Sequence, residues 1–136
     1  MILKEYLQTI FIAEESPVGG WPDSFAVISA CDPHSKGERG SDEKSNFDLL
    51  EHLLSRGFNH HRVIGASRDL MHQEASFAIW GMGLEEALET GRTFHQNAIF
   101  WIERGQVDVV SCTENDRQHL GSWEVKLNPR HSQRSP

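Results

Sequence analysis

The sequence has few cysteines and no long apolar run. Its two thiols, Cys31 and Cys112, each end a predicted strand and are best interpreted as reduced, buried side chains. No apolar run reaches the length of a membrane-spanning helix, and the first residues lack the basic start, apolar middle and small-residue cleavage site of a signal peptide. These absences predict a protein of the cytoplasm.

Basic residues are also scarce. The formal net charge is −7, and the densest basic stretch is the last seven residues, with Arg130 and Arg134. An acidic surface repels nucleic-acid phosphates and anionic lipid headgroups. Nucleic acid and membranes are therefore disfavoured, which leaves a protein partner or a small molecule.

The length suits one domain. A chain of 136 residues buries enough surface to fold without disulfides or metals, and the sequence has no internal repeat and no linker. We expect a single domain over residues 1–127. Residues 128–136 carry no core residue and are expected to form a disordered tail.

Five segments have the composition of strands. The small and apolar run over residues 24–31 is typical of a central strand that is covered on both faces. Further strands are expected over residues 62–66, 75–80, 98–102 and 107–112, and the last two read as a hairpin.

Two helices are expected between these strands. The first begins at Ser41 or Asp42 and ends at Gly57, and the second covers residues 84–95. The inward stripe of the first helix is expected to comprise Phe47, Leu50, Leu53 and Leu54. The order of elements is that of a split βαβ unit extended by a C-terminal hairpin. We therefore predict an α+β fold: a mainly antiparallel sheet of about five strands with two helices packed on one face.

The two ends of the predicted domain show weaker patterns. Residues 2–11 have helical spacing, while residues 9–13 alternate as a strand does, so a short helix that runs into a strand is expected. The alternation of Trp123, Val125 and Leu127 predicts a further edge strand.

Several short motifs stand out: the run 25–33 followed by Asn46, Gly65 after a strand, and the segments 74–77 and 94–101. Together they resemble the bacterial domain of unknown function 3293 family. The most specific of them is Phe94-x-Gln96-Asn97-Ala98. The likeness covers about residues 6–110 and implies a small cytoplasmic α+β domain without an assigned activity. Asp32 stands where an asparagine is expected, which puts in doubt any role of an amide there.

Two amides are candidate ligand-binding residues. Asn46 lies on the inward face of the first helix, where a buried amide needs partners; it either bonds a neighbouring loop such as 32–34 or lines a pocket. Asn97 is interpreted as a helix terminator, because asparagine tolerates a left-handed backbone. Gln96 has less structural reason to be polar and is placed in a pocket.

Glu74, Ser76 and Asp32 complete the candidate site. Glu74 opens the third strand and either acts as a general base or anchors a loop. Ser76 points the same way as Glu74, because strand side chains alternate. Asp32 follows the central strand directly.

No metal or cofactor is expected. The histidine-rich segments, 60–61 and 72–74, lack the spacing of known zinc motifs and read as surface loops. The turn Gly81-Met82-Gly83 resembles a phosphate-binding turn, but Glu85 and Glu86 place negative charge where a phosphate would lie.

Two functions remain open on the sequence alone. The first is a binding or regulatory module that acts through a protein partner or a small ligand. The second is a small enzyme, hydrolytic in character, with Glu74 as general base and Asn46 and Gln96 orienting a polar substrate. Convergence of these three side chains on one open cleft would favour the second function.

Overall fold

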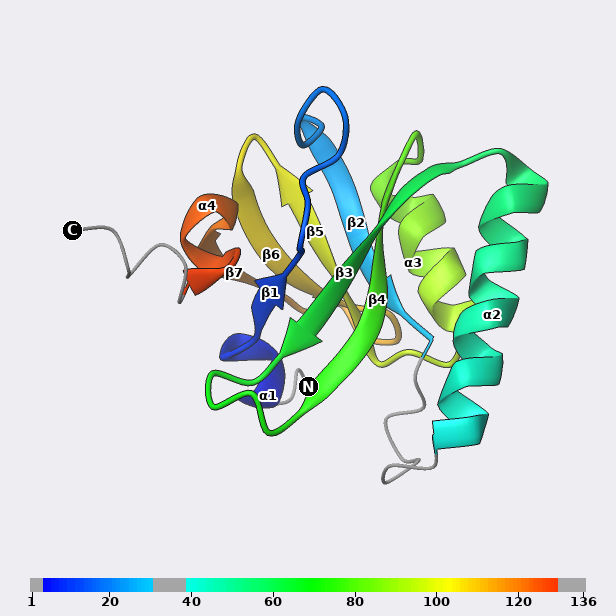
Figure 1. Ribbon diagram of the computed structural model, residues 1–136, viewed down its shortest axis with the longest axis horizontal. Helices are drawn as coiled ribbons and strands as arrows, with labels where there is room; N and C mark the ends of the chain where they lie inside the picture. The colour runs from blue at the N-terminus through cyan, green and yellow to red at the C-terminus, as the bar shows by residue number, and fades with distance from the viewer. Residues whose placement is uncertain (1–3, 31–38, 130–136) are drawn as a thin grey trace.

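The computed structural model describes residues 4–30 and 39–129 (Figure 1). Its strands form one antiparallel sheet in the order β1-β3-β4-β2-β5-β6-β7. The strands are β1 (Ile10–Ile12), β2 (Ser24–Ser29), β3 (Asn59–Ala66), β4 (Gln73–Trp80), β5 (Ala98–Glu103), β6 (Gln106–Ser111) and β7 (Arg117–Ser122). The helices are α1 (Lys4–Leu7), α2 (Arg39–Arg56), α3 (Leu84–Thr93) and α4 (Trp123–Lys126).

Strand β2 lies at the centre of the sheet. It pairs with β4 on one side and β5 on the other. Ala26 and Ile28 belong to a hydrophobic cluster on one face, while Phe25 and Val27 belong to a cluster on the other. This two-sided burial explains why the segment reads as a continuous apolar run.

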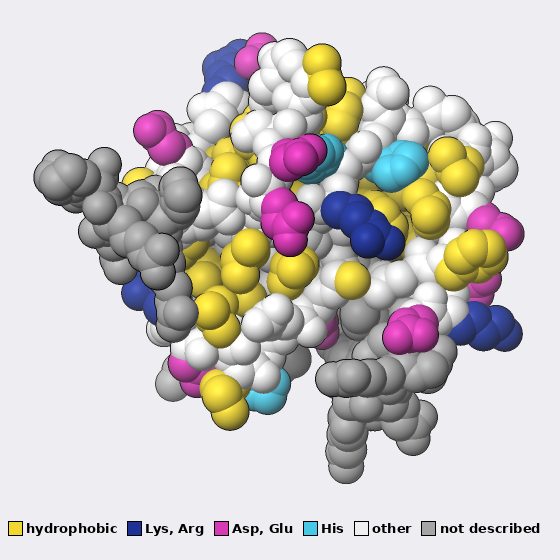
Figure 2. All heavy atoms as spheres, viewed as in Figure 1, with side chains coloured by type: hydrophobic (Ala, Val, Ile, Leu, Met, Phe, Trp, Pro, Cys, Tyr) yellow, Lys and Arg dark blue, Asp and Glu magenta, His cyan; other side chains and the backbone are white. Residues whose placement is uncertain are grey.

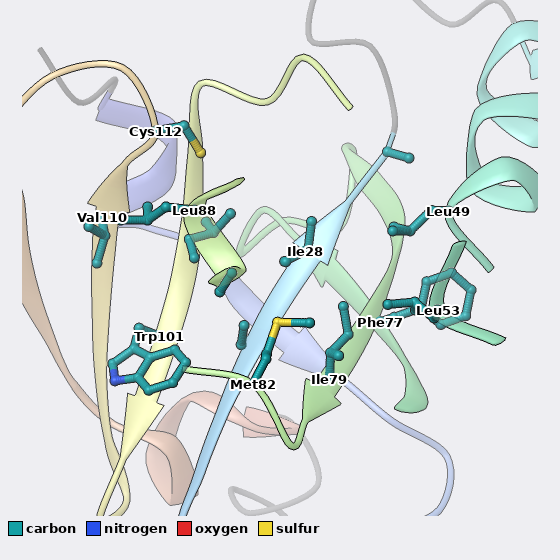
Figure 3. Close-up of a cluster of buried hydrophobic side chains, with 14 residues drawn as sticks. Ile28, Leu49, Leu53, Phe77, Ile79, Met82, Leu88, Trp101, Val110 and Cys112 are labelled. Atoms are coloured by element: carbon teal, nitrogen blue, oxygen red, sulfur yellow. The ribbon is translucent and has the colours of Figure 1, made fainter. Parts of the chain in front are cut away.

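The first cluster lies between the sheet and helices α2 and α3 (Figure 3). Leu49 and Leu53 of α2 reach Phe77, whereas Leu88 of α3 lies above β5. Helix α3 approaches the sheet closely at Gly91, where an added Cβ would lie 2.6 Å from Cys112 Sγ and 2.8 Å from Ile99 Cγ2. A larger residue at position 91 would therefore displace these neighbours.

The second cluster fills the inside of the curl and is rich in aromatic rings. Trp123 lies among them, with ring centroids 4.9 Å from Phe11, 5.1 Å from Phe25 and 5.0 Å from Trp21. Phe11 also meets Phe100 edge to face at 5.0 Å. Edge-to-face contacts of this kind add to the stabilisation from burial.

The segment after β7 joins the two ends of the sheet. Leu127 forms a parallel bridge with Phe11 of β1, and Lys126 Nζ donates a hydrogen bond to Thr9 O at 2.7 Å. The Asn128 side chain bonds both backbone groups of Ala13: Nδ2 donates to O at 2.9 Å, and Oδ1 accepts from N at 3.0 Å. The sheet therefore forms a half-barrel that this segment closes.

The predicted sheet of about five strands with two helices packed on one face is wrong. The sheet has seven strands, it is curled, and hydrophobic clusters cover both of its faces. Strand β7 was not predicted because it begins Arg117-Gln118-His119, without apolar alternation. It is held instead by pairing with β6 and by two contacts to Asp108: an ion pair from Arg117 Nε at 2.6 Å and a hydrogen bond with His119 Nδ1 at 3.0 Å.

Both ends of the described fold can be compared with prediction. The expected short helix that runs into a strand is confirmed as α1 and β1. The edge strand expected from Trp123 to Leu127 is wrong, because this segment contains α4, whose N-cap is Ser122: its Oγ accepts a hydrogen bond from Val125 N at 3.1 Å. Of the predicted tail, Asn128 is bonded to Ala13, just after β1, and residues 130–136 lie outside the described part.

Candidate functional site

Four of the five predicted site residues lie around the carboxyl end of β2. Asn46 comes from α2, Glu74 and Ser76 from the start of β4, and Gln96 from the turn between α3 and β5. Asp32 falls outside the described residues.

Asn46 faces the end of β2 from α2. The side chain is half-buried, and its Oδ1 accepts a hydrogen bond from Ala30 N at 3.4 Å. The amide thus bonds backbone just beyond the last residue of the strand. A bond to backbone was one of the two roles left open for this asparagine, and this one ties α2 to the central strand.

Ser76 and Glu74 lie at the start of β4, on the face of the sheet that α2 does not cover. Ser76 is buried and pairs with Ser29 of β2, and its Oγ donates a hydrogen bond to Glu74 O at 3.2 Å. The Glu74 side chain is exposed, and the residue pairs with Gly65 of β3. The two side chains share one face of β4, as predicted from alternation.

Gln96 closes the turn between α3 and β5. Only 6% of the residue is exposed, and its Nε2 donates a hydrogen bond to Phe94 O at 3.2 Å. The residue with a left-handed backbone at the end of the helix is His95, with φ of 60°. The interpretation of Asn97 as the helix terminator was therefore wrong. Asn97 O instead accepts a hydrogen bond from Cys112 N at 2.9 Å.

The sheet register brings two of these residues to the same strand end, on the side of α2 and α3. Val27 pairs with Phe100, so continuing the antiparallel register leads the end of β2, which Asn46 contacts, to the start of β5, which Gln96 precedes. Ser76 and Glu74 alternate with Phe77, which faces α2, and therefore point to the opposite face of the sheet, so the structure does not bring Asn46, Glu74 and Gln96 into one cleft. Asn46, Glu74 and Gln96 all make interactions of their own. Hydrogen bonding, rather than nucleophilic chemistry, is what such a set of groups can supply.

A groove of about 420 Å³ lies between α2 and α3. His52 and Arg56 line one side and Glu85, Glu86 and Glu89 the other. The carboxylates of Glu85 and Glu86, in the first turn of α3, interact favourably with the positive end of the helix dipole and would repel a phosphate. Among the described residues, no group of three or more histidine, cysteine or acidic side chains is placed to hold a metal ion.

Sequence reasoning missed an apolar surface of α2 that is not used for contact with the sheet. The predicted inward stripe of α2 was wrong in part. Leu53 is fully buried as predicted, and Leu49, which was not predicted, is buried beside it in the core. Phe47 and Leu54, which were predicted to face inward, are 58% and 62% exposed. The signal that could have found this surface is a second apolar spacing within α2, at positions 47, 50 and 54.

This surface is visible on the face that carries α2, β3 and β4 (Figure 2). Hydrophobic side chains gather along α2 and over the two strands, around a basic side chain. Arg62 is the exposed basic residue of β3, and it pairs with Phe77, which faces α2. We call the surface formed by the exposed Phe47 and Leu54, with the partly buried Leu50 between them, the outer flank of α2.

Comparison with known proteins gives one match. The family described as "Protein of unknown function (DUF3293)" matches residues 28–99, more than half of the chain and the whole span from the end of β2 to the start of β5. No curated protein and no solved structure matches the chain. None of the helices in the described residues has the length and apolar character needed to cross a membrane.

Proposed function

The chain belongs to the DUF3293 family, and because that description names no activity, we propose a function from the molecule itself. We propose a small bacterial, cytoplasmic module that binds another polypeptide through the outer flank of α2. The binding is non-catalytic, and the fold serves to present this flank.

The exposure of Phe47 and Leu54 is the observation that carries the proposal. The two residues are seven positions apart on α2 and therefore lie on the same side of the helix. The core does not need them, because Leu49 and Leu53 already fill the contact with the sheet. Large apolar side chains that adjoin one another on a surface are typical of interaction sites.

Position 47 offers a direct test by site-specific photo-crosslinking. Benzoylphenylalanine replaces Phe47 in bacteria that produce the full chain, and the same photo-reactive residue at Val125 serves as the matched control. Val125 is 71% exposed but stands on α4, away from the flank. We expect a discrete adduct from position 47 that Leu54→Glu abolishes, and none from position 125. Equal adducts from both positions, or none from 47, would overturn the proposal.

A small polar ligand is the second candidate, and the half-buried amide of Asn46 at the end of β2 favours it. In the catalytic version of this candidate, Glu74 is the general base. Native mass spectrometry of the purified protein tests both versions. A bound mass in the wild type that is lost in Asn46→Ala supports the site, with Glu51→Ala as an exposed control on the same helix. A clean apo mass after purification and after incubation with cell metabolites counts against it.

A further inference from the structure

We propose that the ammonium of Lys126 and the guanidinium of Arg68 bind a small oxyanion, a phosphate or a carboxylate, where the segment after β7 meets β1. The site uses none of the residues of the outer flank of α2 and goes beyond the proposed function. It follows from a buried lysine that has no opposite charge and from the second cation beside it.

Lys126 is buried although it carries a charge. Only 7% of the residue is exposed, and its Nζ donates a hydrogen bond to Thr9 O at 2.7 Å. An ammonium has three protons to donate, and lysine is almost never fully buried unless it is paired. Within residues 4–30 and 39–129, Lys126 forms no ion pair and no further hydrogen bond. Its ammonium can therefore accept a ligand that brings acceptors and negative charge.

Arg68 approaches the same place from the turn between β3 and β4. Ile10 of β1 pairs with Ala66, the last residue of β3. Continuing this register places Thr9 beside the first residues of the turn, which include Arg68. Figure 1 shows α1, which ends two residues before Thr9, beside this turn. The pKa of Lys126 is lowered by burial first and then by the nearby charge of Arg68, which agrees with this placement.

No carboxylate of the described residues neutralises the two cations. Arg68 forms no hydrogen bond or ion pair there, and the neighbouring Asp69 is bonded elsewhere: its Oδ1 accepts from Ser67 Oγ at 2.6 Å and from Met71 N at 3.0 Å. The whole chain has 20 acidic residues. Like charges placed together repel, and a buried charge costs free energy unless an opposite charge compensates it. A lysine placed only to bond Thr9 O would not need a second cation beside it.

The two side chains suit the oxygens of a phosphate or a carboxylate. Lysine supplies a compact charge, and the planar guanidinium of arginine can donate two parallel hydrogen bonds to two oxygens of one group. Arg68 is exposed, so the anion can enter from solvent along the turn, whereas the burial of Lys126 restricts the site to a small group. A bound anion links the segment after β7 to the β3–β4 turn and so stabilises the closure of the half-barrel.

A heteronuclear NMR titration of the full chain tests the proposal. Inorganic phosphate and acetate are added separately at millimolar concentrations, with chloride keeping the ionic strength constant because salt screens charges. We expect saturable shifts of the backbone amides at Thr9, Arg68 and Leu127. Tighter binding of phosphate or of acetate identifies which of the two oxyanions the site prefers.

Two variants and two matched controls assign the binding to these side chains. Arg68→Gln and Lys126→Met should each raise the dissociation constant about tenfold or more, because each removes a charge-assisted hydrogen bond. Arg56→Gln and Lys44→Met remove exposed charges on α2 and should leave the constant unchanged.

The spectra without anion show whether each variant keeps its fold. If Lys126→Met unfolds, Arg68→Gln is sufficient, because position 68 is exposed. Three results would each overturn the proposal: no shift at these amides with either anion, unchanged affinity in Arg68→Gln, or an equal loss in Arg56→Gln.

Discussion

Helices α2 and α3 cover the same face of the sheet but use their surfaces differently. Helix α3 has 10 residues, and Ala87, Leu88, Thr90 and Gly91 are buried. Helix α2 has 18 residues, yet its fully buried side chains are Leu49 and Leu53. The longer helix therefore carries apolar residues that the core does not use.

The difference arises from how closely each helix approaches the sheet. Gly91 has no side chain, so the backbone of α3 packs closely against the sheet, with Cα atoms of α3 within 8 Å of Cα atoms in β2 and β5. Small residues therefore suffice where α3 meets the sheet. Helix α2 packs through two leucines instead, which hold it further out and leave Phe47 and Leu54 on its flank. A helix that contacts the core through a narrow stripe retains surface for a partner.

The largest expected change in stability comes from a comparison of two adjacent leucines of α2. Leu53→Ala leaves a cavity in the core and should lower the free energy of unfolding by about 2–5 kcal/mol. Leu54→Ala removes an exposed side chain and should change it by no more than about 0.5 kcal/mol. Urea unfolding followed by circular dichroism measures both. Similar losses for the two variants would show that the flank belongs to the core.

The close approach of α3 can be tested at Gly91. Gly91→Ala places a Cβ 2.6 Å from Cys112 Sγ. We expect a loss of about 1–3 kcal/mol, despite the better helix propensity of alanine, because overpacking forces the neighbours to move. Gly83→Ala is the matched control: its added Cβ meets nothing within 4 Å, and its loss should stay below about 1 kcal/mol. A stabilised Gly91→Ala variant would contradict the tight contact.

The smallest effect concerns the thiol beneath α3. Burial raises the pKa of Cys112 from 9.0 to about 11, against the lowering influence of Arg92. Folding therefore favours the neutral thiol, and the stability that this contributes is complete below pH 9 and declines as the pH rises from 9 towards about 11. Denaturant titrations at a series of pH values should show this decline in the wild type and a shallower one in Cys112→Ala. Identical slopes would mean that the thiol is accessible.

Elements with a clear hydrophobic pattern could be predicted from the sequence. The continuous run in β2 and the periodic α3 are both close to the expected bounds. Strand β7 depends on pairing with β6 and on contacts to Asp108, which no local pattern encodes. Helix α4 was mistaken for a strand because Trp123 and Leu127 fit both periods, and only the cap at Ser122 separates the two.

The candidate site shows the same limit. Asn46, Ser76 and Gln96 were identified as polar residues in unusual positions, and the register of the sheet brings them near one strand end but on two faces of the sheet. Their partners are backbone groups such as Ala30 N and Phe94 O, which sequence reasoning cannot locate. The outer flank was missed for a different reason: one helix carries two apolar stripes, and the sequence alone does not tell which of them faces the sheet.

The closure of the half-barrel also sets an order of events during synthesis. Ala13 and Asn128 are 115 positions apart, so nearly the whole described fold must leave the ribosome before they can meet. Contacts of such long range slow folding, because the loop must close before the contact stabilises it. Until Trp123 arrives, the aromatic rings of Phe11 and Phe25 lack the indole that packs between them. The nascent chain therefore exposes an apolar surface during synthesis, and this is the stage at which a chaperone would bind it.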